Sequence, residues 1–144
     1  MNQDKKVIIA IPLYRDLREE EMIALNNNLS VLRQYPVVLV KPKGLNTKDL
    51  RKKYPQIGEI EVSDDWLGTK NGILGYNEMM TSPVFYSLFS DYEYLLICQT
   101  DVWIFRDDLM KWIDMGIDLV GAPWPNRNMY LHFPMKQYLQ LKVK

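Results

Sequence analysis

Short apolar runs alternate along the chain with segments of helical periodicity, and this alternation constrains the fold more than any other feature. The apolar runs cover residues 7–13, 37–40, 94–100 and 118–122, and residues 57–62 alternate imperfectly between apolar and polar side chains, which predicts a half-exposed strand at a sheet edge. The first is a continuous run, typical of a strand that is covered on both faces of a sheet. Strands that alternate with helices predict right-handed crossovers and a mostly parallel sheet. We therefore expect a three-layer α/β fold with helices on both faces of the sheet.

Helices are expected between these runs. Asp16 followed by Glu19 has the spacing of a capping box, which opens a helix, and the acidic residues 19–21 suit the positive end of its dipole. Apolar residues then recur at helical spacing until the chain nears Pro36, which disfavours a helical residue before it. Further helices are predicted over residues 47–54, 73–80, 84–89 and 107–116, the third opened by Ser82-Pro83 and the last capped by Asp107 and stopped by Gly116.

The predicted strand order is 3-2-1-4, with strand 5 beyond. Ligands of such sheets bind beyond the carboxyl ends of the strands, where the strand order reverses. The reversal falls between strands 1 and 4, whose ends carry residues 12–15 and 99–101. Asp101 stands there between two apolar runs, and an unpaired buried carboxylate is costly. We therefore expect Asp101 to face a ligand crevice; the alternative is a carboxylate bound by backbone N–H groups in a turn.

Composition limits the classes of protein that fit the chain. Its 144 residues suit one domain, in which residues 126–144 form an irregular or helical tail. Eighteen basic residues balance eighteen acidic ones, without the one-sided positive charge of nucleic-acid-binding proteins. No apolar run approaches the roughly 20 residues of a transmembrane helix. The apolar stretch at the N-terminus lacks a cleavage site of small residues, so a cytoplasmic location is expected.

Several common catalytic and binding motifs are absent from the sequence. There is no G-x-G-x-x-G after the first strand, no G-x-x-x-x-G-K-[ST], no G-x-S-x-G and no H-E-x-x-H. Cys98 is the only cysteine, which excludes intramolecular disulfides. His132, the only histidine, is expected at the surface or at a helix cap. No residue stands out as a catalytic base.

Five short segments stand in order between residues 7 and 125: IPLY, VLVKP, GYNEMM, YEYLLICQTD and VGAPW. Together they resemble a bacterial family of predicted glycosyltransferases that was long labelled a domain of unknown function and occurs among polysaccharide-biosynthesis proteins. That family is similar to the nucleotide-binding, Rossmann-like half of GT-A glycosyltransferases. The resemblance implies a nucleotide-sugar donor, a glycan acceptor and a role in the synthesis of cell-surface polysaccharide.

The resemblance also implies a divalent cation. In GT-A enzymes an Asp-x-Asp element after the fourth core strand holds the cation on the donor diphosphate. Here that element reads Gln99-Thr100-Asp101, so only its last acid is present. Mg²⁺ or Mn²⁺ can use one or two protein carboxylates, with phosphate and water as the other ligands. Asp101 is therefore the expected metal ligand, and Gln99 either orients the same site or forms hydrogen bonds within the sheet.

Four further residues are candidates for binding the donor. Tyr14 and Arg15 follow the first strand, where a base could stack on the ring and a phosphate could meet the guanidinium. Lys70 and Asn71 stand among glycines, which let a backbone approach a diphosphate closely. The alternatives are an ordinary loop tyrosine, a surface arginine and a flexible loop before a helix.

Other positions carry weaker expectations. Asp65 follows the third strand and would contact a base or ribose, or else is a solvated loop acid. Asn77 would reach the donor, or else caps and bridges loops. Trp103 and Phe105 are expected to pack in a way that fixes the turn carrying Asp101. Trp124 would offer a flat face to a sugar ring or cover exposed core.

Two other interpretations stay open. Proteins of the resembling family continue past the GAPW-like segment with an acceptor-binding portion, whereas this sequence stops at Lys144. The chain would then be a catalytically inactive remnant that acts as a self-associating module, for instance a homodimer, because large bare apolar patches rarely persist in monomers. The remaining interpretation is an unrelated α/β nucleotide-binding protein.

Overall fold

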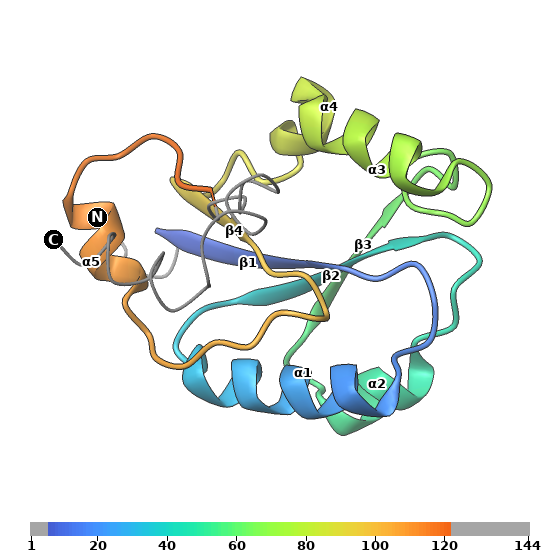
Figure 1. The fold of residues 1–144 in the computed structure, drawn as a ribbon, viewed down its shortest axis with the longest axis horizontal. Helices are drawn as coiled ribbons and strands as arrows, with labels where there is room; N and C mark the ends of the chain where they lie inside the picture. The colour runs from blue at the N-terminus through green and yellow to red at the C-terminus, as the bar shows by residue number, and fades with distance from the viewer. Residues whose placement is uncertain (1–5, 122–144) are drawn as a thin grey trace, which may run out of the picture. The chain divides into compact units, whose positions relative to one another are not determined.

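Strands and helices alternate along residues 6–121, the part of the chain that the computed structural model describes (Figure 1). The predicted tail 126–144, Trp124 and His132 lie outside these residues. By its internal contacts the chain divides into two compact units, one ending at Met110 and one beginning at Lys111. The elements are β1 (Val7–Pro12), α1 (Glu19–Val31), β2 (Val37–Pro42), α2 (Lys48–Lys53), β3 (Gly58–Val62), α3 (Gly72–Thr81), α4 (Pro83–Ser87), β4 (Tyr94–Ile97) and α5 (Leu109–Asp114).

The four strands form one sheet in the order β3-β2-β1-β4, and every pair is parallel. This confirms the predicted order of the first four strands and the place of β3 at an edge. The prediction of a fifth strand over residues 118–122 is wrong for residues 118–121, the part that the structure describes, because these residues form no strand. Leu119 is 88% exposed. An apolar run becomes a strand only where it finds a pairing partner, and β-propensity alone does not supply one.

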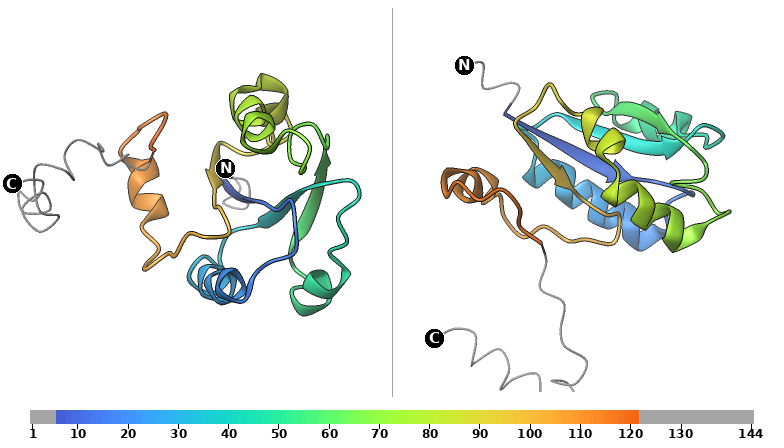
Figure 2. Two further views of the ribbon diagram at one scale, coloured as in Figure 1. Left: turned by 45° about the vertical axis from the view of Figure 1, so that its right-hand side comes forward. Right: turned by 90° about the horizontal axis from the view of Figure 1, so that it is seen from above.

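Helices cover both faces of the sheet, with α1 and α2 on one face and α3 and α4 on the other (Figures 1 and 2). Side chains of a strand point alternately to its two faces. In β1, Ile8 and Ala10 therefore belong to the apolar cluster under α3 and α4, whereas Ile9 and Ile11 belong to the cluster over α1 and α2. All six residues of β1 are buried, which explains its continuous apolar run.

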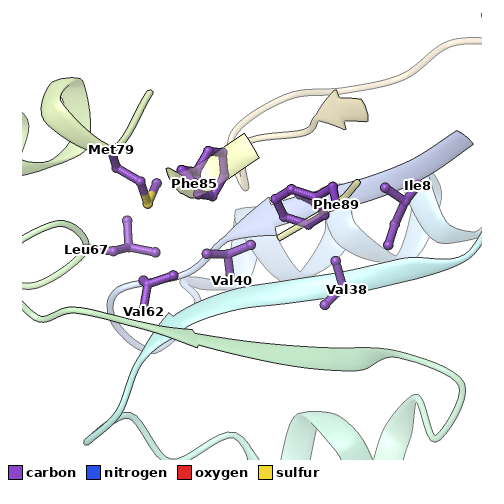
Figure 3. Close-up of a cluster of buried hydrophobic side chains, with 9 residues drawn as sticks. Ile8, Val38, Val40, Val62, Leu67, Met79, Phe85 and Phe89 are labelled. Carbon is purple, nitrogen blue, oxygen red and sulfur yellow. The ribbon is translucent and has the colours of Figure 1, made fainter. Parts of the chain in front are cut away.

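The cluster under α3 and α4 is built around aromatic side chains. Phe85 is fully buried, and its ring centroid lies 5.3 Å from that of Phe89 in an edge-to-face arrangement. Figure 3 shows Phe85 and Met79 facing Val40 of the sheet. This packing fixes α3 over the sheet and so fixes the loop that precedes it.

Helix α1 begins later than predicted. Arg18 is its N-cap residue, and the backbone N–H of Arg18 donates a 2.8 Å hydrogen bond to the side chain of Glu21. The pair that opens the helix is thus Arg18 and Glu21, and the capping role assigned to Asp16 and Glu19 is wrong. Both pairs have the same three-residue spacing, and residue type favours Asp16 over Arg18 as the N-cap, whereas the contacts of Glu21 with Arg15 and Thr100 accompany the later start.

Two predicted helix ends are confirmed. The carboxylate of Asp107 accepts a 3.1 Å hydrogen bond from the backbone N–H of Leu109, the first residue of α5. Gly116 follows this helix with φ of +65°, a conformation that favours glycine. No helix within residues 6–121 is both long and apolar enough to cross a membrane.

Candidate functional site

A pocket of about 500 Å³ lies beyond the carboxyl ends of β1 and β4. Residues after β1, the loop 66–69, the start of α3 and the turn 99–101 form its walls, together with Glu21 of α1. The sheet order changes direction between β1 and β4, which is where ligands of parallel sheets bind. All of these residues belong to the unit that ends at Met110.

Four of the predicted site residues come together in the pocket lining. They are Tyr14, Arg15, Gln99 and Asp101. Strand β4 ends at Ile97 rather than at Thr100, so Gln99 and Asp101 lie in the turn beyond the strand. Their meeting follows from parallel pairing, because the carboxyl ends of neighbouring parallel strands lie at one edge of the sheet.

The carboxylate of Asp101 is exposed at the pocket wall. Among the described residues, no hydrogen bond or ion pair involves this carboxylate. The alternative of a carboxylate bound by backbone N–H groups is therefore not seen within residues 6–121. A free carboxylate that borders a pocket can accept hydrogen bonds or bind a cation.

The turn that carries Asp101 is held by two asparagines of α1. The Nδ2 atom of Asn28 donates to the carbonyl of Val102 at 2.7 Å, and its Oδ1 atom accepts from the N–H of Ile104 at 2.9 Å. Asn27 donates to the carbonyl of Ile104 at 2.7 Å. Asn28 is only 4% exposed, so its amide is buried at the centre of this partly buried network. The amides of α1 thus satisfy backbone groups that leave the sheet after β4.

The sequence analysis missed this role of Asn28. A signal was present, because Asn28 stands on the apolar stripe of α1 between Leu25 and Leu32, and asparagine is a poor helix former. The packing expected of Trp103 and Phe105 is wrong, since both rings are exposed, Phe105 to 88%. The hydrogen bonds of Asn28, and not these rings, fix the turn.

A second network joins the ends of β1 and β4 through Glu21. The Nη1 and Nη2 atoms of Arg15 donate to the two carboxylate oxygens of Glu21 at 2.7 and 2.8 Å. The hydroxyl of Thr100 donates to the same carboxylate at 3.0 Å. Glu21 is only 8% exposed. The sequence predicted only a favourable interaction of this acid with the helix dipole, whereas the structure shows a buried carboxylate that bonds to residues following both β1 and β4.

These contacts shift the pKa values of both partners. The hydrogen bonds from Arg15, with further ones from the backbone of Arg18 and from Thr100, outweigh desolvation and lower the pKa of Glu21 to about 2. The hydrogen bond to Glu21 raises the pKa of Arg15 above its ordinary value. The pair is therefore charged on both sides and makes no net contribution to the charge of the pocket.

The remaining pocket wall is aromatic with a polar rim. Tyr14, Trp66 and Tyr76 line it, and the Nε2 atom of Gln99 donates to the hydroxyl of Tyr76 at 2.9 Å. Gln99 thus bonds to α3 and not within the sheet. Aromatic rings of this kind can stack on a planar base or on the apolar face of a sugar.

The other four predicted site residues do not line the pocket. Lys70 forms a 2.8 Å ion pair with Asp65, which lowers the pKa of Asp65 and raises that of Lys70, and Asn71 donates to the Asp65 carbonyl at 3.0 Å. These contacts link the two ends of the segment 65–71 to each other and do not reach the pocket. Asn77 is exposed on α3. A side chain at Gly75 would place its Cβ 2.1 Å from the Asp65 carbonyl oxygen, so this glycine lets α3 pack against the loop.

The site has limited means to hold a metal by protein groups alone. Within residues 6–121, no three His, Cys, Asp or Glu side chains are grouped so as to hold a metal ion. Mg²⁺ and Mn²⁺ do not need such a group when phosphate and water supply most of their ligands. The free carboxylate of Asp101 in the pocket lining fits a cation that arrives with a phosphate ligand.

Comparison with family models identifies a match over the second half of the chain. A family model described as "Protein of unknown function (DUF5672)" matches residues 56–143. No curated protein matches the chain, and no solved structure matches it. The matched stretch includes α3, β4 and the turn 99–101, but not β1 or α1.

Proposed function

The chain belongs to the DUF5672 family of proteins of unknown function, and we propose that it is a GT-A-like glycosyltransferase domain that binds a nucleotide-sugar donor. The acceptor would be a glycan, and the process the synthesis of cell-surface polysaccharide. Support comes from a parallel α/β sheet with a pocket at the reversal of its strand order. The resemblance of five ordered segments to predicted glycosyltransferases supplies the chemistry.

The observation that carries the proposal is the free carboxylate of Asp101 in a pocket of about 500 Å³. A pocket of this volume lies within the range of small-molecule sites. An unpaired carboxylate there repels a bare diphosphate and attracts a cation. Asp101 would hold Mg²⁺ or Mn²⁺ together with the donor diphosphate. When bound, the cation neutralises the negative charge that develops on the departing nucleoside diphosphate.

The other side chains of the pocket have binding roles in this proposal. Tyr14, Trp66 and Tyr76 supply ring faces on which a base or a sugar ring can stack. Because Gln99 donates to Tyr76, the Oε1 atom of Gln99 and the hydroxyl hydrogen of Tyr76 stay available to sugar hydroxyls. These groups orient the donor while Asp101 positions its diphosphate.

A thermal-shift experiment tests the proposal. The full chain is heated with UDP-sugars or GDP-sugars, with Mn²⁺ or with a chelator, and compared with the variants Asp101→Asn and Asp49→Asn. Asp49 is an exposed acid on α2 outside the pocket lining and serves as the matched control. Because a ligand at about 100 times its Kd stabilises a protein by about 2.7 kcal/mol, a specific donor produces a clear shift.

The expected shift requires both Mn²⁺ and Asp101. It occurs in the wild type and in Asp49→Asn, and it is lost in Asp101→Asn. An equal shift in Asp101→Asn would remove this residue from the site. The absence of a shift with every donor would refute donor binding itself.

A second candidate function is a self-associating, catalytically inactive module. It is favoured by the exposed apolar side chains after β4, namely Val102, Trp103 and Phe105. In addition, β4 pairs only with β1 among the described strands, and open strand edges tend to pair with another chain. Sedimentation over a wide concentration range decides the point. A dimer dissociated by Phe105→Ser would support this function, and a monomer at all concentrations would exclude it.

A further inference from the structure

We propose that Glu21 is a specificity-determining residue of the pocket, because it neutralises Arg15 and so makes diphosphate binding depend on a divalent cation. This inference rests on the proposed function. Of the described residues that line the pocket, Arg15 is the cationic one. An arginine beside a phosphate site would ordinarily bind the phosphate directly through its planar fork.

In this structure both terminal nitrogens of Arg15 already bond to protein groups. Both of its terminal nitrogens donate to Glu21, and Nη1 also donates to the carbonyl oxygen of Asp16 at 2.8 Å. The side chain of Glu21 is 10% exposed and that of Arg15 is 31% exposed. Removing Arg15 from Glu21 would leave a buried carboxylate without its cation, which is strongly unfavourable. A phosphate therefore competes poorly with Glu21 for this guanidinium.

The net charge of the pocket lining follows from these contacts. The charges of Arg15 and Glu21 cancel, and the charge of Asp101 is left over. A diphosphate alone thus meets a wall with a net negative charge. Asp101 would hold a divalent cation whose charge would offset this repulsion. The need for the cation accordingly arises from Glu21 as well as from Asp101.

The variant Glu21→Gln tests the proposal, with Glu20→Gln as its control. Glu20 is the neighbouring exposed acid outside the pocket lining, so both variants make the same change in net charge. The Kd of UDP and of GDP is measured by titration calorimetry, once with a chelator and once with Mn²⁺. In Glu21→Gln the metal-free Kd is expected to tighten on the order of tenfold, the size of effect that one uncompensated charge near the ligand produces. In Glu20→Gln it is expected to equal that of the wild type.

A double variant tests the charge argument separately from the loss of the Glu21 carboxylate. Arg15→Gln combined with Glu21→Gln removes both charges, so the balance of the pocket stays as it is in the wild type. Its metal-free binding should stay as weak as that of the wild type, and its Mn²⁺-dependent binding should stay within about threefold. This double variant also provides a test if Glu21→Gln alone does not fold.

Each result has a defined meaning. Equal metal-free Kd values for Glu21→Gln and Glu20→Gln would overturn the role of Glu21 while leaving donor binding intact. A loss of more than about tenfold in Mn²⁺-dependent binding by the double variant would also overturn it, because Arg15 would then be bonding to phosphate. A wild type that binds neither nucleotide with Mn²⁺ would overturn the proposed function together with this inference.

Discussion

The side-chain amide of Asn28 donates a 2.7 Å hydrogen bond to the carbonyl oxygen of Val102, a residue 74 positions further along the chain. Glu21 stands two helical turns before Asn28 on the same face of α1 and accepts a hydrogen bond from Thr100. The two side chains hold the chain on either side of Asp101. The position of Asp101 is thus determined by a helix that carries no predicted ligand-binding residue.

Replacing Asn28 should destabilise the protein through this turn. Asn28→Ala leaves the carbonyl of Val102 and the N–H of Ile104 without their partners, which should lower the free energy of unfolding by about 1–3 kcal/mol. Chemical denaturation measures the loss, and amide hydrogen exchange should be faster at Ile104. Ser30→Ala, at an exposed position of the same helix, is the control. Equal stability of the two variants would contradict the role given to Asn28.

The Arg15–Glu21 pair should govern part of the stability in acid. The pKa of Glu21 is lowered from 4.5 to about 2 in the folded protein. The unfolded chain therefore binds the proton more tightly than the folded protein does. The contribution of Glu21 to the free energy of unfolding is present above about pH 4.5 and is lost as the pH falls towards 2. Stability measured between pH 6 and 2 should fall less steeply in Glu21→Gln than in the wild type. Parallel curves would show that the pair does not contribute in this range.

Helix α3 should not tolerate a side chain at Gly75. The Cβ of Gly75→Ala would lie 2.1 Å from the carbonyl oxygen of Asp65, so the helix or the loop must move. We expect a loss of about 1–3 kcal/mol and weaker donor binding, because this loop continues into the pocket wall at Trp66. Gly44→Ala, which meets no atom within 4 Å, is the control. Unchanged stability in Gly75→Ala would show that the loop adapts freely.

The periodicity of the sequence was enough to predict the sheet. Buried parallel strands are continuous apolar runs, and the rule for strand ends then brought Tyr14, Arg15, Gln99 and Asp101 to one pocket. The prediction for Lys70 was wrong, because its ammonium forms an ion pair with Asp65 of the same loop and does not line the pocket.

The roles of Glu21 and Asn28 could not be predicted in the same way. Thr100, which bonds to Glu21, and Val102, which bonds to Asn28, lie more than 70 residues further along the chain, so these contacts depend on how α1 packs beside the end of β4. Local pattern shows only that an acid opens a helix and that an amide interrupts its apolar stripe. The strand expected over 118–122 failed for a related reason, because a local apolar run does not specify a pairing partner.

Diffraction from crystals of the full chain soaked with UDP or GDP and Mn²⁺ tests the central claim most directly. At the manganese absorption edge, we expect an anomalous peak within about 2.5 Å of a carboxylate oxygen of Asp101, with the diphosphate as a second ligand of the ion. Nucleotide density in the pocket with no manganese at Asp101, or manganese bound elsewhere, would contradict the account.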